Sequence, residues 1–307
     1  MSVVVGVDIG GTKIAAAVLD ADPARVARVP TPGSPAAIVA AVASVIHDVA
    51  EEAEIGAVGV GSAGAFDPQG RVASATDLLP GWSGTPLATL LAETVDAPVV
   101  AVNDVHAAAV AEARRGAAVG VSSAIVVAIG TGIGGAVVLD GRVLTGVRGL
   151  AGSIGHLTVP GSGRRCSCGA VGHVEAIASG PAMESEYLRR VGGELPLRFE
   201  EIARLAETGD AEAADVIQES AAMLGTALAS AAALVDPEMI VVGGGVSAVG
   251  SRLLDPLIGG FRSAALPEQR AVRVVGAAFG ASATTVGAAL LARDALERAE
   301  RDVGTAP

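Results

Sequence analysis

The 307-residue sequence predicts an α/β fold built from two similar halves. Short apolar runs alternate with longer Ala-rich segments, the order typical of α/β proteins. The stretch Asp8–Asp20 also aligns with Ala128–Asp140 without gaps, at an offset of 120 residues, and six residues recur. Both stretches have the pattern of a strand, a Gly-rich turn and a second strand. We therefore expect each half to open with such a hairpin.

Composition narrows the class of protein. Hydrophobic residues make up 51% of the chain, which indicates a folded globular protein. The net charge of −12 argues against a nucleic-acid partner, and the 2% of aromatic residues argues against base-stacking surfaces. The N-terminus has no basic region before Asp8, so it does not resemble a secretory signal. Glycines interrupt the uncharged stretches Gly116–Leu139 and Val274–Ala292, so we expect no membrane span and a cytoplasmic protein.

The first third of the chain predicts two helices and four strands. Ser34 suits a helix cap and Pro35 the first helical turn, which predicts a helix over Ser34–Glu54. The other expected elements are strands at Val3–Ile9, Ile14–Leu19, Ala57–Gly61 and Pro98–Val102, and a helix at Val105–Arg115.

The rest of the chain alternates again. We expect helices at Glu212–Val235, Leu253–Arg262 and Ala281–Arg301, strands at Met239–Val242 and Val272–Val275, and a turn at Gly243-Gly244-Gly245. The expected small lobe comprises residues 1–117 with a C-terminal helix of about 288–307, and the large lobe comprises residues 118–287. Two similar lobes leave a cleft between them, a common place for a ligand.

The segment Gly130–Gly135 fits the pattern G-x-G-x-x-G, but its surroundings do not fit a dinucleotide site. Such a motif should open a helix and meet an acid about 20 residues later. Here a strand-like run follows, and Asp140 comes too early. A protein kinase is excluded because no H-R-D or D-F-G motif follows. Glycines still let backbone N–H groups approach phosphate oxygens, so a phosphate turn and an ordinary hairpin turn both stay open.

Four segments together resemble a known family. Asp8-Ile9-Gly10-Gly11-Thr12-Lys13 resembles the first phosphate motif of sugar kinases with the actin/hexokinase-like (ribonuclease H-like) fold, and Asn103-Asp104 resembles their catalytic pair. Gly149–His156 followed by Cys166–Glu175 resembles the zinc motif of the ROK family (repressors, open reading frames, kinases). The resemblance covers nearly the whole chain. It implies an ATP- and Mg²⁺-dependent kinase that phosphorylates the 6-hydroxyl of a hexose.

The resemblance also implies a role for each matching residue. Asp104 is the expected general base, and Asp8 is expected to act on the magnesium of the nucleotide, directly or through water. The expected nucleotide-binding residues are Asp8, Gly10, Gly11, Thr12, Lys13, Gly130, Thr131, Gly132, Gly243, Gly244 and Gly245. The expected sugar-binding residues are Asn103, Ser153, His156, Glu175, Gly64 and Asp77.

Physical chemistry supports part of this assignment. Phosphoryl transfer to a sugar needs a proton acceptor for the attacking hydroxyl. Asp104 begins a predicted helix, whose N-terminus favours negative charge, so we expect it to stay ionised. A helix cap without catalytic role is the alternative for Asp104. Lys13, the single lysine, can equally reflect a bias towards arginine. We expect His47 and His106 to be structural or helix-surface residues.

Two departures from the family pattern concern metal and substrate. Cys166 and Cys168 are too close in sequence for a good disulfide and suit a metal site. The family usually has a third cysteine where this chain has His173, yet His156, Cys166, Cys168 and His173 still make four ligands for a structural Zn²⁺. A loop with two free thiols is the alternative.

The second departure is Ser153, which stands where family glucokinases carry Glu. A serine cannot supply the charge-assisted acceptor of a carboxylate, and Asp77 replaces a frequent Asn. Glucose and an N-acylhexosamine such as N-acetylmannosamine therefore both remain open. Polyphosphate also remains open as the phosphoryl donor. A sugar-binding or regulatory role with weak or no kinase activity is the alternative function. A DNA-binding regulator of the family is disfavoured because the first strand starts near Val3. A homodimer is the family expectation.

Overall fold

The computed structural model describes residues 2–22, 25–75, 79–193 and 196–304, and it divides into two compact units. Unit 1 comprises Met1–Arg115, Thr145–Ala151 and Ser282–Pro307, and unit 2 comprises Gly116–Leu144 and Gly152–Ala281. The expected boundaries differ from this division in three places. The first part of unit 1 ends at Arg115 and not at residue 117. The segment Thr145–Ala151 groups with unit 1, and the C-terminal part of unit 1 already begins at Ser282.

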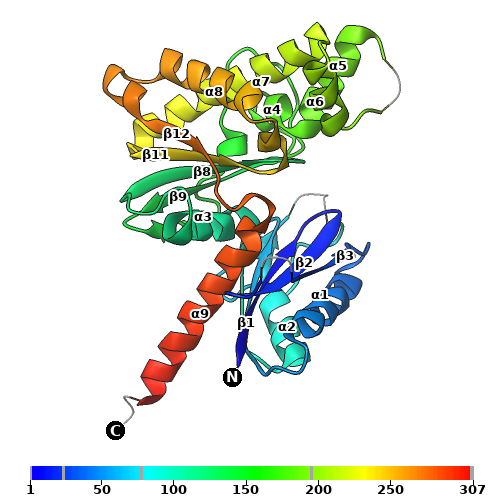
Figure 1. Cartoon of the computed structure of the whole chain (residues 1–307), viewed down its shortest axis with the longest axis vertical. Helices are drawn as coiled ribbons and strands as arrows, with labels where there is room; N and C mark the ends of the chain where they lie inside the picture. Colours follow the sequence, from blue (N-terminus) through cyan, green and yellow to red (C-terminus); the bar gives the residue numbers. More distant parts are fainter. Residues whose placement is uncertain (1, 23–24, 76–78, 194–195, 305–307) are drawn as a thin grey trace. The chain divides into compact units, whose positions relative to one another are not determined.

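Unit 1 is built on a five-stranded sheet with the strand order β3-β2-β1-β4-β7 (Figure 1). The first hairpin is antiparallel, whereas β4 and β7 run parallel to β1. Two further short strands, which lie between β4 and β7 in the sequence, form a separate antiparallel hairpin. The strands are β1 (Val3–Ile9), β2 (Lys13–Val18), β3 (Val26–Pro30), β4 (Ile55–Ser62), β5 (Ala65–Phe66), β6 (Val72–Ser74) and β7 (Val99–Asn103).

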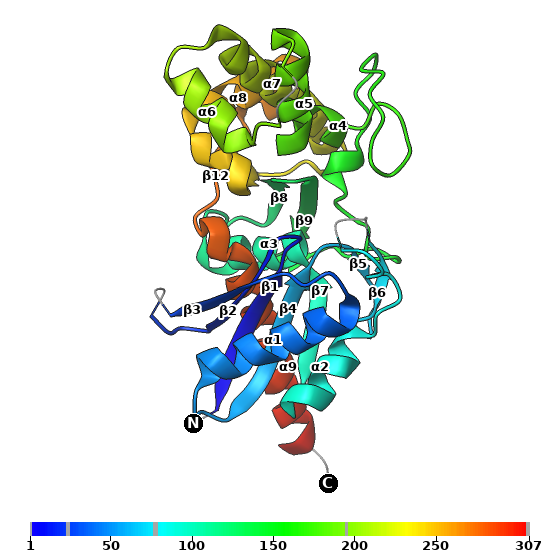
Figure 2. The ribbon, with the colours of Figure 1, turned by 90° about the vertical axis from the view of Figure 1, so that its right-hand side faces the viewer.

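Helices cover both faces of this sheet (Figures 1 and 2). α1 (Pro35–Ala50) and α2 (Leu87–Val95) lie on one face, and α3 (Asp104–Arg115) and α9 (Ala283–Gly304) on the other. α9 packs very closely on the sheet: a Cβ on Gly6 would lie 1.9 Å from the carbonyl oxygen of Thr285. Part of the glycine content therefore serves close helix–sheet packing.

Helix α1 begins as predicted but ends earlier. The Ser34 hydroxyl accepts the Ala37 N–H at 3.4 Å, which is the expected cap. The prediction that the helix extends to Glu54 was wrong. Glu51 adopts a φ of +54°, and its N–H donates to the carbonyl of His47, so the helix stops at Ala50. The other predicted helices and strands are present with bounds that differ by a few residues.

Unit 2 repeats the sheet plan with the order β10-β9-β8-β11-β12. Its hairpin is antiparallel, and β11 and β12 run parallel to β8. β8 starts at residue 123 and β1 at residue 3, so the hairpins recur at the predicted offset of 120. The strands are β8 (Ser123–Ile129), β9 (Ile133–Leu139), β10 (Arg142–Val143), β11 (Met239–Gly243) and β12 (Arg273–Gly276).

Five α-helices of unit 2 build its apolar core against this sheet. α7 and α8 pack against each other, and a Cβ on Gly225 would lie 2.0 Å from the carbonyl oxygen of Leu257. Within the described ranges no helix is both long and apolar enough to cross a bilayer. The helices are α4 (Glu175–Ala178), α5 (Gly180–Val191), α6 (Phe199–Glu207), α7 (Ala211–Val235) and α8 (Ser251–Ala264), with 3₁₀ turns η1 (Ile154–His156), η2 (Gly245–Val249), η3 (Pro267–Ala271) and η4 (Gly280–Ser282).

Candidate active site and metal centre

The turn between β1 and β2 carries the first predicted phosphate motif. The N–H of Gly10 donates to the carbonyl of Lys13 at 3.0 Å, and the carbonyl of Gly10 accepts the hydroxyl of Thr31 at 2.6 Å. These bonds close the turn, while Gly11 and Thr12 are exposed at its tip. The structure thus brings the predicted residues together in one exposed glycine turn, a backbone form suited to an anion.

Asp8 lies on β1, just before this turn, and pairs with Ala15 of β2. The pKa of Asp8 is raised from its usual 3.8 to about 7. Burial is the largest cause, the negative charge of Asp104 adds to the rise, and the positive charge of Lys13 opposes it. The two carboxyl groups therefore lie near enough to repel each other when both are ionised. A bound cation would relieve that repulsion, which fits a magnesium-binding role.

Asn103 ends β7 and caps α3. Its Oδ1 accepts the N–H of Val105 at 3.0 Å and of His106 at 3.1 Å, and its Nδ2 donates to the carbonyl of Gly64 at 3.0 Å. Asn103 and Gly64, both predicted sugar-binding residues, are thus joined to each other. The side chain of Asn103 also hydrogen-bonds to the carboxyl group of Asp104, which lowers the pKa of Asp104.

Asp104 is the first residue of α3, as predicted, but its pKa is raised. Burial is the largest cause, and the opposing contributions include the Val105 N–H, which donates to Oδ1 at 2.9 Å, and the nearby His106. Desolvation thus outweighs the helix N-terminus and these hydrogen bonds in the direction of the shift, which the sequence did not indicate. A carboxylate with a raised pKa is a stronger base, which suits proton abstraction.

His106 is only 6% exposed, so the prediction of a helix-surface residue was wrong. Its Nε2 lies 3.0 Å from the carbonyl oxygen of Ala151, so this nitrogen donates and the ring holds the segment Thr145–Ala151 against α3. Burial lowers the pKa of His106. The same segment approaches β5, because a Cβ on Gly149 would lie 2.6 Å from the carbonyl oxygen of Phe66. His47 is exposed, as expected.

The turn between β8 and β9 holds the second predicted phosphate motif. The N–H of Gly130 donates to the carbonyl of Gly132 at 2.9 Å, and the N–H of Gly180 donates to the carbonyl of Gly130 at 2.9 Å. Thr131 is exposed at the tip. The N–H of Ile133 donates to Oε2 of Glu175 at 3.0 Å. The turn is therefore tied to the starts of α4 and α5.

The third segment predicted to bind nucleotide, Gly243–Gly245, lies beside this second turn within unit 2. Gly243 pairs with Ala128 at the end of β8. Gly244 has a φ of +86°, and a Cβ there would lie 2.3 Å from the carbonyl oxygen of Ile129. Only glycine tolerates both conditions, so the backbone requires it at this position.

The four predicted metal ligands converge in unit 2. One ligand atom from each of His156, Cys166, Cys168 and His173 lies within 4.8 Å of all the others. The Nδ1 atoms of the two histidines are 3.2 Å apart, Cys168 Sγ lies 3.2 Å from His173 Nδ1, and Cys166 Sγ lies 3.9 Å from His156 Nδ1. Tetrahedral zinc with ordinary bond lengths needs ligand separations of roughly 3.3–3.8 Å. The donor set and its spacing therefore fit Zn²⁺.

Glu175 connects this cluster to the second phosphate turn. Its Oε1 accepts the hydroxyl of Ser167 at 3.1 Å and lies 3.5 Å from Cys166 Sγ, and its Oε2 accepts the N–H of Ile133. The sequence had indicated only a sugar-binding role for Glu175. Ser153 is exposed and directly precedes η1, which contains His156. Asp77, the remaining predicted sugar-binding residue, lies outside the described residues.

Two sheets of one topology, each opening with a glycine-turn hairpin, define the actin/hexokinase-like (ribonuclease H-like) fold class. The model of the ROK family matches residues 4–295. The chain belongs to the ROK family. It is 35% identical over 322 aligned residues to a glucokinase of Streptomyces coelicolor, a match that covers 96% of this chain and 98% of that protein.

Two further comparisons add detail. An N-acetylmannosamine kinase of Escherichia fergusonii is 34% identical over 242 residues, covering 78% of this chain and 82% of that protein. The crystal structure of a ROK family glucokinase from Streptomyces griseus in complex with glucose and AMPPNP matches with a TM-score of 0.86 and 34% identity. That match covers 95% of this chain and 100% of the other. The family predicted from the sequence motifs is confirmed.

Proposed function

We propose that this protein is an ATP-dependent sugar kinase that transfers the γ-phosphoryl group to the 6-hydroxyl of a hexose. The observation that carries the proposal is the pair Asp8, which lies on β1 just before the glycine turn, and Asp104, which begins α3 and raises the pKa of Asp8 by its charge. Such a pair can supply a proton acceptor and a cation ligand at one place. Kinase relatives that align over most of the chain support the same reaction.

Asp104 acts as the general base in this proposal. As the sugar oxygen bonds to the γ-phosphorus, Asp104 accepts the hydroxyl proton, and the bond between that phosphorus and the bridging oxygen breaks to release ADP. Asn103, His156 and Glu175 hold other sugar hydroxyls. The two glycine turns and Gly243–Gly245 hold the nucleotide. A magnesium ion at Asp8 would offset the charge of the phosphates.

Zinc has a structural role in the proposal. Held by His156, Cys166, Cys168 and His173, it would fix the segment of residues 156–173, which we call the metal loop, and through it Glu175. The close convergence of the four ligand atoms supports this assignment. Metal analysis of untagged protein should find about one zinc ion per chain, and full activity without zinc would contradict it.

The sugar is glucose or an N-acylhexosamine such as N-acetylmannosamine. Ser153 is smaller than the glutamate of family glucokinases and leaves room near carbon 2 of the sugar. The kinship with both a glucokinase and an N-acetylmannosamine kinase supports keeping both substrates. The proposal further includes a cytoplasmic homodimer, which light scattering would test.

A coupled ADP-release assay tests the proposed function. The panel comprises glucose, mannose, fructose, glucosamine, N-acetylglucosamine and N-acetylmannosamine, each with ATP and with polyphosphate as donor. We expect turnover with ATP on glucose or an N-acylhexosamine. No turnover on any sugar, combined with tight binding of one, would instead favour a sugar-binding or regulatory role.

A further inference from the structure

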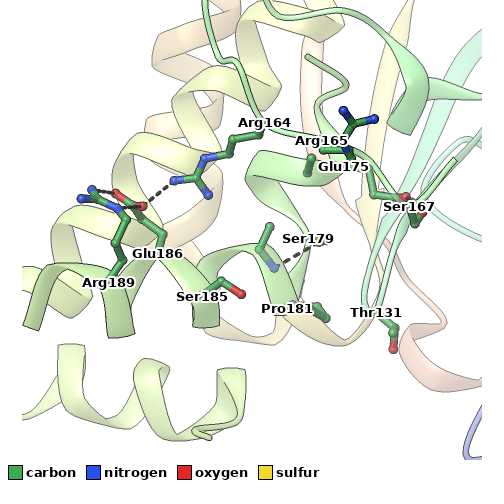
Figure 3. Close-up of a pocket in the computed structure, with 12 residues that line it drawn as sticks. Thr131, Arg164, Arg165, Ser167, Glu175, Ser179, Pro181, Ser185, Glu186 and Arg189 are labelled. Atoms are coloured by element: carbon green, nitrogen blue, oxygen red, sulfur yellow. Dashed lines mark hydrogen bonds and ion pairs between the residues drawn. The ribbon is translucent and has the colours of Figure 1, made fainter. Parts of the chain in front are cut away.

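A cavity of about 730 Å³ in unit 2 lies between the metal loop and helix α5 (Figure 3). Arg164 and Arg165 of the metal loop and Arg189 of α5 line it, and we call it the arginine cavity. Thr131 and Glu175 line it as well. The arginine cavity therefore forms part of the proposed nucleotide and sugar site rather than a second site.

A different buried group, the imidazole of His106, has no role in the proposed phosphoryl transfer. His106 is only 6% exposed and lies in the first turn of α3, which Asp104 begins. Its Nε2 lies 3.0 Å from the carbonyl oxygen of Ala151, and because a carbonyl only accepts, Nε2 carries a proton and donates. The backbone N–H of His106 donates to Oδ1 of Asn103 at 3.1 Å. The start of α3 thus fixes the ring, and the ring holds Ala151.

Ala151 ends a closed loop, Thr145–Ala151, which groups with unit 1 although unit 2 supplies the chain on both sides of it. The N–H of Ala151 donates to the carbonyl of Thr145 at 3.1 Å and closes the loop. Val147 and Leu150 are 99% and 52% exposed, so apolar burial does little to hold the loop. The hydrogen bond from His106 therefore supplies a side-chain anchor at the C-terminal end of the loop.

The residues after this loop are predicted to bind the sugar. The chain enters unit 2 at Gly152, and Ser153 and the turn η1 follow directly. Gly152 has a φ of +81°, and a Cβ there would lie 2.7 Å from the Cα of Ala136, so this connection is closely packed. Successive Cα atoms are about 3.8 Å apart, which keeps Ser153 within about 8 Å of Ala151. A shift of Ala151 would therefore be passed on to Ser153.

We propose that His106 is a positioning residue for sugar binding, a role that rests on the proposed function. Its hydrogen bond to Ala151 fixes the backbone that presents Ser153 and His156 to the sugar hydroxyls. The first turn of α3 then sets both the general base, Asp104, and this backbone. A misplacement of about 1 Å is enough to weaken such contacts strongly. Loss of the hydrogen bond should thus weaken sugar binding and spare the nucleotide, whose predicted ligands lie in the glycine turns.

Calorimetric titration of the full chain with each sugar of the panel, in the absence of nucleotide, tests this role. His106→Leu removes the donor, and we expect it to bind the preferred sugar about ten-fold more weakly. Its binding of AMPPNP should stay within about two-fold of the wild type. His106→Gln should bind the sugar nearly as the wild type does, because its Nε2 is as many bonds from Cβ as that of histidine and also donates. His47→Leu, at an exposed position of α1, is the control.

Limited digestion with trypsin reports on the loop without any sugar. Arg148 is exposed within the loop, and cleavage after it needs local opening of the backbone. Mass spectrometry of the fragments should show cleavage there about ten-fold faster in His106→Leu than in the wild type. His106→Gln and His47→Leu should be cut at the wild-type rate.

Sugar affinity distinguishes a positioning role from a merely structural one. Unchanged sugar affinity in His106→Leu would overturn the proposal whatever the cleavage rate, as would parallel losses of sugar and AMPPNP binding. A folded His106→Gln protein with weakened sugar binding would overturn it too. A wild-type protein that binds none of the sugars would instead contradict the proposed function, and this role with it.

Discussion

The hairpins of the two units share one backbone plan but differ in charge. In unit 1 the hairpin carries Asp8 and Lys13, whereas the residues 120 positions later in the sequence are Ala128 and Ile133. Both turns have a glycine as their first residue, whose N–H bonds back to the carbonyl of a turn residue. The loop of the second hairpin is one residue shorter, because Ile129 pairs with Ile133 whereas Ile9 pairs with Ile14. Both turns are closed by backbone hydrogen bonds, and of the two hairpins β1–β2 and β8–β9 only the first carries charged residues.

The fifth strand of each sheet shows the same contrast. In unit 1 the chain leaves β7 through Asn103 into Asp104, while in unit 2 it leaves β12 through Gly276 into Ala277. Unit 2 instead carries the four-ligand metal cluster. A glycine turn needs only backbone N–H groups to hold a phosphate, but proton transfer and cation binding need carboxylates at one place. Carboxylates in one of the two units are therefore sufficient for proton transfer and cation binding.

The strongest test of this contrast makes the charged hairpin resemble the neutral one. Asp8→Ala places in unit 1 the residue that unit 2 has at the equivalent position. We expect kcat to fall by about 10²-fold or more, because the cation that offsets the charge of the phosphates loses its carboxylate ligand. Steady-state kinetics would show it, with Asp48→Asn on the exposed face of α1 as a control of unchanged activity.

The same variant has the opposite effect on stability. The pKa of Asp8 is raised from 3.8 to about 7 in the folded protein, so the folded state keeps a proton that the unfolded state has lost. The free energy of unfolding therefore decreases as pH rises through this window. Above about pH 7, metal-free Asp8→Ala should be more stable than the wild type by up to a few kcal/mol, with no such gain near pH 4. Urea titrations at both pH values check the sign.

Removal of the metal should affect unit 2 next most strongly. His173→Ala deletes one of four ligands, so we expect loss of zinc and a lower Tm by several degrees, about 1–3 kcal/mol. His173→Cys restores the usual ligand type of the family and should keep zinc. His47→Ala removes an exposed histidine and should change neither quantity. Equal zinc content in His173→Ala and wild type would contradict the ligand assignment.

A smaller effect is expected at His106 in unit 1. His106→Leu leaves the carbonyl of Ala151 without its ring donor, which should cost about 1–3 kcal/mol in the free energy of unfolding. Chemical denaturation measures it, and His47→Leu at an exposed position gives the baseline. A His106→Leu protein as stable as the wild type would mean that the buried hydrogen bond contributes nothing.

The smallest expected effect concerns sugar choice. Ser153→Glu introduces the carboxylate found in family glucokinases and a charge-assisted acceptor for a sugar hydroxyl. We expect kcat/KM for glucose relative to N-acetylmannosamine to rise about ten-fold. Steady-state kinetics of both proteins on the two sugars measure this ratio, and an unchanged ratio would show that Ser153 does not determine the choice of sugar.

Features set by local backbone patterns could be predicted from the sequence. The hairpins follow from glycines between apolar runs, and the cap at Ser34 follows from its hydroxyl. Resemblance and ligand spacing together predicted the cluster around Cys166 and His173, and the structure brings those atoms together.

Features that depend on tertiary packing could not be predicted. Helix α3 is Ala-rich and buried on several sides, so no periodicity marks His106 as buried. The raised pKa of Asp104 depends on desolvation by neighbouring elements rather than on its place in the helix. The arginine cavity joins the metal loop to α5, two segments that the sequence gives no reason to pair.

The central claim is that the carboxylate chemistry resides in unit 1 and that Asp104 is the proton acceptor. An ADP-release assay comparing Asp104→Asn with the wild type on the preferred sugar tests it most directly. The account predicts a 10²–10⁴-fold fall in kcat with little change in KM for ATP. Normal turnover by Asp104→Asn would contradict it.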